Sequence, residues 1–266
     1  MSNERTSKLA EHGSLSSSAF PPPSTILVTS MVSTEIETTL IHDRAFRSKE
    51  RHVKLLAKLI SQTKKPTGLL GLVMTKAMNR VHGKLTNWGL SFIEIKENDI
   101  ILDIGCGGGK TVNKLARTVK NGKVYGIDHS DVSVRSSTKL NSYFIDGNKV
   151  EIKRASVSSL PYPDNFFDVI TAIESYFFWP NLESDMKEVL RVLRSKGKLL
   201  LVSEVARTPR NEKTIDRYAR LADTSDFMHY QTKDELNQLL VKTGYDDINI
   251  HENMKHGWVA GVGCKP

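Results

Sequence analysis

An apolar segment that ends in a run of glycines limits this chain to few folds. Residues 100–110 read IILDIGCGGGK. Glycine lets the backbone turn sharply and approach a ligand closely, and the first turn of a helix presents free amide groups and the positive end of its dipole. The segment therefore predicts a strand, a ligand-binding loop and a helix in direct succession.

Strand-like and helix-like segments alternate after residue 100, which predicts an α/β fold with a mostly parallel sheet and covering helices. The strand candidates are residues 100–104, 123–128, 150–154, 167–173, 198–204, 247–251 and 257–263. The helix candidates between them are residues 110–119, 131–142, 182–193 and 234–243. Only residues 252–256 join the last two strands, and parallel neighbours need a much longer crossover, so we expect an antiparallel pair at one edge of the sheet.

A second element of the ligand site is Asp128, which ends the second predicted strand 23 residues after Gly105. An acid at about this distance accepts hydrogen bonds from ribose hydroxyls, so the pair predicts a nucleoside ligand. Gly105, Gly107 and Gly109 are spaced one residue short of the dinucleotide fingerprint, which disfavours NAD. The loop also lacks the Lys–Ser/Thr ending of a phosphate-binding P-loop.

These motifs resemble those of the class I S-adenosylmethionine-dependent methyltransferases, in particular the type 11 group of small-molecule enzymes. DIGCGGG at 103–109 matches the first motif of the family, and Asp128 matches its ribose-binding acid. LPYPDNFFD at 160–168 and the turn at 191–199 match later motifs. The resemblance covers roughly three quarters of the chain, from about residue 66 to the end.

The resemblance implies S-adenosyl-L-methionine as the cofactor and a Rossmann-like, seven-stranded, mostly parallel sheet with an antiparallel last strand. Helices would cover both faces, and an N-terminal helical extension would precede the sheet. We expect three parts in the chain: a flexible leader rich in Ser, Thr and Pro (1–38), a helical extension and lid (39–90) and a methyltransferase domain (91–266). Residues 206–231 would contribute to the lid.

The resemblance also assigns cofactor-binding residues, from the glycine loop to the segment after the fourth strand. They are Asp103, Gly105, Cys106, Gly107, Asp128, His129, Ser156, Val157 and Glu174. Ser156 stands where the family often has an acid that meets the adenine amino group. Adenine contacts would therefore come from Ser156 and the backbone near Val157.

Methyl transfer needs a nucleophile held in line with the carbon–sulfur bond, and it needs a base only if the acceptor atom carries a proton. Glu174 is a candidate base or hydrogen-bond acceptor, with a structural polar contact as the alternative. Tyr176 begins a run of four aromatic residues that either line the site or fill the core. His82, in the expected lid, titrates near neutral pH and is a further candidate base, or else a surface residue.

Partners follow from the distribution of charge. The formal net charge is +8, and residues 44–65 alone carry eight basic and one acidic side chain. A small-molecule acceptor is the first expectation. RNA or a peptide recruited by the basic segment 44–65 is the alternative, and a non-catalytic module that binds the cofactor is a third. The sequence assigns no oligomeric state.

Other classes of protein and site are disfavoured. The chain has two cysteines, Cys106 and Cys264, and no Cys/His cluster with zinc-site spacing, so we expect no metal and a cytoplasmic location. No apolar run approaches the roughly 20 residues of a membrane span. DNA is not expected as a substrate, because the fourth strand ends in ESYF where amino-methylating DNA enzymes carry an Asn/Asp-Pro-Pro-aromatic motif.

Overall fold

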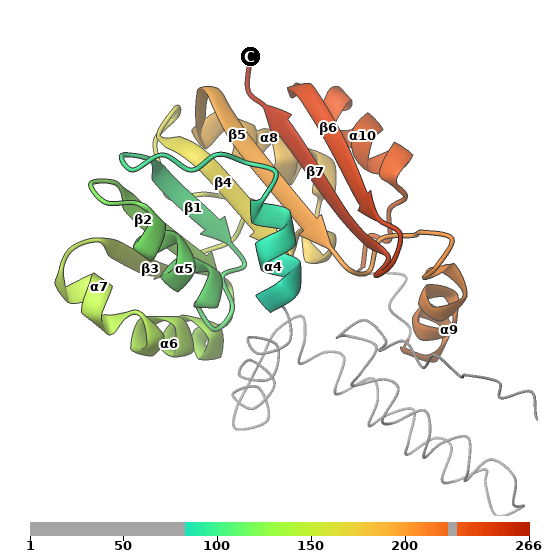
Figure 1. The fold of residues 1–266 in the computed structure, drawn as a ribbon, viewed down its shortest axis with the longest axis horizontal. Helices are drawn as coiled ribbons and strands as arrows, with labels where there is room; N and C mark the ends of the chain where they lie inside the picture. The colour runs from blue at the N-terminus through green and yellow to red at the C-terminus, as the bar shows by residue number, and fades with distance from the viewer. Residues whose placement is uncertain (1–82, 223–227) are drawn as a thin grey trace, which may run out of the picture.

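The computed structural model describes residues 83–222 and 228–266, whose strands form one twisted sheet (Figure 1). The strands are β1 (Ile100–Ile104), β2 (Lys123–Asp128), β3 (Val150–Arg154), β4 (Phe167–Ile173), β5 (Leu193–Ser203), β6 (Asp246–Asn253) and β7 (Trp258–Cys264). Their order is β3-β2-β1-β4-β5-β7-β6, and β7 is antiparallel to both of its neighbours, whereas β1 to β5 are parallel. The predicted antiparallel edge pair is confirmed.

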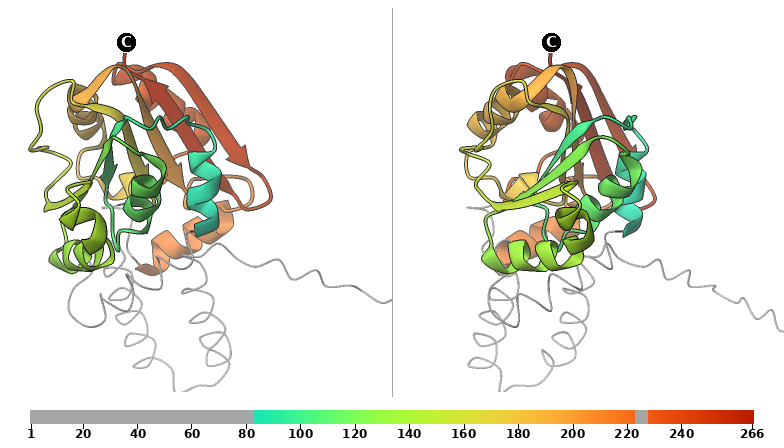
Figure 2. Two further views of the ribbon diagram at one scale, coloured as in Figure 1. Left: turned by 60° about the vertical axis from the view of Figure 1, so that its left-hand side comes forward. Right: turned by 90° about the vertical axis from the view of Figure 1, so that its left-hand side faces the viewer.

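Helices cover both faces of this sheet. They are α4 (Gly83–Leu90), α5 (Lys110–Thr118), α6 (Asp131–Leu140), α7 (Ser142–Asp146), α8 (Leu182–Val192), α9 (Glu212–Ala222) and α10 (Lys233–Lys242), with a 3₁₀ turn, η1 (Tyr176–Phe178), after β4. Figure 1 shows α4 and α5 in front of the sheet and α8 and α10 behind it, and Figure 2 shows the two helical layers from the side. The predicted α/β class with helices on both faces is therefore confirmed.

The sequences of the central strands are continuous apolar runs, because both faces of these strands are buried. In β5, Leu199 and Leu201 pack into the hydrophobic cluster under α8 and α10, whereas Leu200 between them packs into the cluster under α4 and α5. Ile101 and Leu102 in β1 divide between the same two clusters. The alternation of side chains along a strand thus anchors both helical layers to the same backbone.

Several predicted elements have different boundaries in the structure, and all of these differences except the start of β5 are one or two residues. The predicted helix 131–142 stops at Leu140, because the buried Asn141 donates its amide group to the carbonyl oxygens of Gly109 and Ser137 and thereby ties the end of α6 to the glycine loop. Strand β5 begins at Leu193, five residues earlier than predicted. Leu193 pairs with Phe167 before the register shifts between Phe167 and Val169.

Helix α10 lies one residue earlier than the predicted range 234–243, but it has the cap and the closing glycine that its sequence predicts. Thr232 and Glu235 form a reciprocal capping box, in which the Thr232 hydroxyl accepts from the Glu235 N–H and the Glu235 carboxylate accepts from the Thr232 N–H. Gly244 follows the helix with a positive φ of 97°.

Several predictions lie outside the described residues. These are the leader 1–38, the basic segment 44–65, His82, residues 39–82 of the helical extension and lid, and residues 223–227 of the second lid segment. Within residues 83–222 and 228–266, no helix is long and apolar enough to cross a membrane.

Candidate active site

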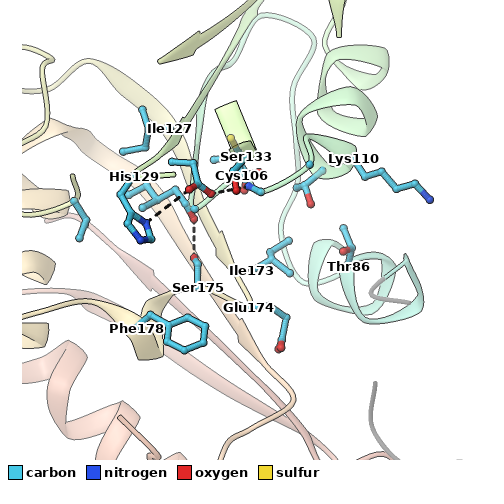
Figure 3. Close-up of a pocket in the computed structure, with 18 of the residues that line it drawn as sticks. Thr86, Cys106, Lys110, Ile127, His129, Ser133, Ile173, Glu174, Ser175 and Phe178 are labelled. Carbon is cyan, nitrogen blue, oxygen red and sulfur yellow. Dashed lines mark hydrogen bonds and ion pairs between the residues drawn. The ribbon is translucent and has the colours of Figure 1, made fainter. Parts of the chain in front are cut away.

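A cavity of about 440 Å³ opens at the carboxyl ends of β1 and β4 (Figure 3). The strand order reverses between these two strands, and open α/β sheets bind ligands at such a point. The cavity is lined by the loop after β1, the end of β2, the turn after β3, the segment after β4 and the first turn of α4. Its volume is in the range of small-molecule sites.

The glycine loop shapes one wall of this cavity. Gly105 has a φ of 72°, and a Cβ atom on it would lie 2.4 Å from the Cβ of Ser175, so the loop packs tightly against the segment after β4. The N–H groups of Gly105 and Cys106 both donate to the Ile127 carbonyl oxygen at 2.9 Å. Gly107 has a φ of 51°. A Cβ atom placed on it would lie no closer than 4.0 Å to another atom, so its backbone faces open space.

Asp128 is held at the end of β2 by two backbone amides. Its Oδ2 accepts from the Gly107 N–H at 3.0 Å and its Oδ1 from the Ser130 N–H at 2.8 Å. Burial raises the pKa of Asp128, and these two hydrogen bonds oppose the rise. A carboxylate has about four lone-pair sites, so Asp128 can accept further hydrogen bonds from a diol in the cavity.

Asp103 in β1 is buried in the same wall. Its Oδ1 accepts from the Thr171 hydroxyl at 2.6 Å. Burial raises the pKa of Asp103 to about 7; the Thr171 hydrogen bond opposes the rise and the nearby Asp128 adds to it. None of the groups that shift this pKa is cationic, so an ammonium group that entered the cavity would stabilise the ionised form.

Glu174 follows β4 and is strained, with a φ of 58° that side-chain-bearing residues seldom adopt. The residue is 8% exposed and lines the cavity. The Glu204 N–H donates to Glu174 Oε1 at 2.5 Å. Burial is the main cause that raises the pKa of Glu174 well above its ordinary value, and the neighbouring Glu204 adds to it.

The structure brings most of the predicted site residues together. Those that line the one cavity are Asp103, Gly105, Cys106, Gly107, Asp128, His129, Ser156, Val157 and Glu174. Tyr176 does not line it: its ring packs in the hydrophobic core and its hydroxyl hydrogen-bonds to Ser203. Of the next aromatic residues, Phe177 is in the core only, Phe178 packs against the core and lines the cavity, and Trp179 both belongs to the core and lines the cavity.

Other lining residues were not found from the sequence. Thr86 and Asn87 come from α4, Ser175 follows Glu174, and Lys110 and Lys114 come from α5. Figure 3 shows the Lys110 side chain extending away from the glycine loop. In the expected lid segment 206–231, no described residue lines the cavity. No local motif marks these positions, since only the packing of separate elements brings them to the site.

Cys106 is unsuited to nucleophilic chemistry. It is buried, and burial raises the pKa of its thiol well above the ordinary value. Its Sγ lies 3.8 Å from the Ser137 hydroxyl oxygen. Cys106 therefore stays an uncharged thiol in the loop. Among the described residues, no group of His, Cys, Asp or Glu side chains is arranged to hold a metal ion.

Comparison with known proteins matches residues 102–201 to a family model described as a methyltransferase domain. A 27-O-demethylrifamycin SV methyltransferase of Amycolatopsis mediterranei (strain S699) is 34% identical over 119 residues, which are 44% of this chain and 43% of that protein. The matched part thus spans less than half of that relative.

A longer match and a structural match extend the comparison. A ubiquinone/menaquinone biosynthesis C-methyltransferase UbiE of Neisseria meningitidis (serogroup C, strain FAM18) is 25% identical over 225 residues, covering 77% of this chain and 89% of that protein. The crystal structure of a SAM-dependent methyltransferase from Aquifex aeolicus aligns with a TM-score of 0.60 and 19% identity, covering 72% of this chain and 97% of that one.

Proposed function

Because the chain belongs to the class I S-adenosylmethionine-dependent methyltransferases, we propose that it methylates an O, N or C atom of a small-molecule metabolite. The observation that carries the proposal is one cavity that combines the glycine loop, two buried aspartates and a buried glutamate. The names of the two relatives, one an O-demethylrifamycin methyltransferase and one a quinone-biosynthesis C-methyltransferase, support an organic small molecule as the acceptor.

The residues of the cavity fit the cofactor. When bound, S-adenosylmethionine supplies a methyl group from its sulfonium sulfur. We assign Asp103 to its ammonium group, because in the described part of the chain this carboxyl accepts from the Thr171 hydroxyl and none of the groups that shift its pKa is cationic. Asp128 would accept from the ribose hydroxyls, and Ser156 and Val157 would flank the adenine. The open space at the missing side chain of Gly107 allows a ligand to approach its backbone closely.

Glu174 is our candidate for the base. It is the carboxyl group on the β4 side of the cavity, and its Oε1 is already held by the Glu204 N–H. Oε2 is therefore the oxygen assigned to the acceptor's proton. Phe178 and Trp179 line the same side and help to exclude water, and an aromatic ring face there would favour a sulfonium charge.

The experiment that tests the proposal has two stages. Equilibrium dialysis with labelled S-adenosylmethionine should show binding at tens of micromolar, and the protein should then methylate at least one compound from a panel of phenols, amines, quinols and hydroxylated polyketides. Mass spectrometry would detect the added methylene unit. Absence of cofactor binding would overturn the assignment of the cavity, and binding without turnover on a broad panel would overturn the proposed transfer.

Replacing Asp128 by alanine is expected to weaken cofactor binding by about 1–3 kcal/mol, since the ribose hydroxyls would lose their acceptor inside a buried site. Calorimetric titration would measure the rise in Kd, roughly 5- to 150-fold. The control is Asp131→Ala, which removes a carboxylate that forms an exposed ion pair with Arg154 on the surface. An unchanged affinity in Asp128→Ala would show that the ribose is held elsewhere.

Cofactor affinity is expected to rise with pH between about 5.5 and 7. Because the pKa of Asp103 is raised to about 7, the protonated form predominates below that pH and must lose its proton before it can pair with an ammonium group. The Kd should therefore fall by up to about tenfold per pH unit in this window. Asp103→Asn should bind more weakly and show a flat profile. If the pH dependence persists in Asp103→Asn, its cause is the titration of another group.

A further inference from the structure

One histidine joins the segment before α10 to the 3₁₀ turn η1. The His229 N–H donates to the Phe177 carbonyl oxygen at 2.8 Å, and the His229 Nε2 lies 2.9 Å from the Trp179 carbonyl oxygen. A carbonyl oxygen can only accept, so the half-buried imidazole donates through its Nε2–H group. His229 therefore holds the turn through its backbone and its side chain together, although it follows Trp179 by 50 residues.

The turn η1 benefits from partners outside itself. Two backbone hydrogen bonds of 3.0 Å close it, from the N–H groups of Phe178 and Trp179, and the hydrogen-bond geometry of a 3₁₀ turn is poorer than that of an α-helix. Pro180 ends the turn, because the residue before a proline favours extended backbone, and Trp179 has a ψ of 137°. The bonds to His229 thus fix a short turn at the point where its own hydrogen bonds stop.

His229 itself belongs to a fixed stretch of chain. On one side of it, Met228 is 4% exposed and packs in the same hydrophobic cluster as Phe177. On the other side, the Gln231 carbonyl oxygen accepts from the Arg207 N–H at 2.8 Å, shortly after the end of β5. Because both sides of His229 are anchored to the body of the protein, its two hydrogen bonds transmit that fixed position to η1.

The turn carries one wall of the cavity. Phe178, Trp179 and Pro180 line the cavity, and Figure 3 shows the Phe178 ring. They follow Glu174, the candidate base, within six residues. His229 does not line the cavity. Any effect of His229 on the site must therefore pass through this wall.

We propose that His229 is a positioning residue that fixes the wall of residues 178–180 for the acceptor. Methyl transfer requires the acceptor atom to lie in line with the carbon–sulfur bond, and a displacement of about 1 Å caused by a change away from the chemistry can slow a reaction about 10²-fold. The inference rests on the proposed function, because it assumes that the acceptor lies between this wall and Glu174. Two aromatic rings and a proline there suit the apolar part of such a molecule.

The first test compares three replacements of His229 and needs no acceptor. His229→Gln places an amide N–H near the position of Nε2, His229→Asn reaches only to that of Nδ1, and His229→Ala has no donor. All three lack the imidazole ring, so its direct effect on neighbouring signals is the same in each. The comparison therefore isolates the hydrogen bond to the Trp179 carbonyl.

The full chain would be labelled with 5-fluorotryptophan, which gives three fluorine signals, from Trp88, Trp179 and Trp258. The Trp179 signal is assigned by its loss in Trp179→Phe. We expect a single narrow Trp179 signal in the wild type and in His229→Gln. In His229→Asn and His229→Ala this signal should broaden or split, because the turn has lost one of its two bonds to His229.

The matched control is His251→Ala. The His251 ring stacks on Phe92 with the ring centroids 3.8 Å apart, and it belongs to β6 at the edge of the sheet. This change also removes a half-buried imidazole but should leave the Trp179 signal as it is in the wild type. The amide spectrum of each variant checks that it is folded. If His229→Ala does not fold, the comparison of His229→Gln with His229→Asn decides.

Kinetics separate positioning from a purely structural role. With the first phenol or quinol that the wild type methylates, His229→Ala should raise KM and lower kcat/KM by about 10- to 100-fold. His229→Gln should keep most of the activity. A loss of folded protein alone would lower the apparent kcat and leave KM unchanged. The Kd of S-adenosylmethionine should change far less than KM, because its assigned partners Asp103 and Asp128 lie on β1 and β2.

Three results would overturn the inference. They are a Trp179 signal that is the same in the wild type and in a folded His229→Ala, a KM that is unchanged in that variant, and a His229→Gln that behaves as His229→Ala does. Failure of the proposed function has a different signature. A protein that methylates nothing in the panel would disprove the transfer, and its Trp179 signal would still show whether His229 holds the wall.

Discussion

Replacing Gly105 by valine is expected to abolish cofactor binding and to destabilise the fold. Gly105 has a φ of 72°, and any Cβ there would lie 2.4 Å from the Cβ of Ser175. The left-handed conformation costs a residue with a side chain about 1–2 kcal/mol, and overpacking adds roughly 1–3 kcal/mol. The loop can relieve the overlap only by moving away from the segment after β4, which would displace the backbone of Gly107 from the ligand.

Calorimetry with S-adenosylmethionine and urea unfolding would measure the two effects of Gly105→Val separately. Gly147→Val is the matched control. Gly147 lies at the end of α7 and does not line the cavity. A Cβ atom placed on it would lie no closer than 3.5 Å to the surrounding atoms. This variant should bind the cofactor as the wild type does. If Gly105→Val bound the cofactor with wild-type affinity, cofactor binding would not depend on this turn.

Replacing Glu174 by glutamine is expected to lower kcat by about 10²- to 10⁴-fold, the usual contribution of a positioned base. The amide keeps the shape of the side chain and can still accept the Glu204 N–H, but it cannot take a proton. Cofactor affinity should change far less than kcat, because the assigned ammonium and ribose partners are Asp103 and Asp128. Single-turnover kinetics with an identified acceptor would separate the chemical step from binding.

The pH profile provides a second measurement on Glu174. The base must be ionised, and its pKa is raised by burial and by Glu204, so the wild-type rate should increase as pH rises through that raised pKa. Glu174→Gln should lack this dependence. The control is Glu97→Gln, an exposed residue paired with Lys120, whose profile should match that of the wild type. A Glu174→Gln enzyme with undiminished kcat would remove this residue from the mechanism.

The sheet was largely predictable because its signals are local. The ranges predicted for β1 to β4 agree with the structure, since β1 and β4 are mostly apolar, β2 and β3 combine apolar with polar residues, and turn residues precede each of them. The end of α6 was not predictable, because Asn141 stops the helix by binding the carbonyl of Gly109, 32 residues earlier in the chain. Tyr176 was ambiguous for a related reason: an aromatic run contains no local sign of which ring faces the core.

The amino-acid sequence by itself determined the strand–loop–helix unit, the distance from Gly105 to Asp128 and hence the kind of cofactor to expect. These features depend on backbone freedom and spacing within a short stretch of chain. Only the tertiary structure placed the backbone N–H of Glu204 against Glu174, buried Asp103 beside the Thr171 hydroxyl, and separated Tyr176 from Phe178. The surroundings and proton affinity of a buried carboxyl depend on which distant elements pack around it, and that information is not carried by any one segment.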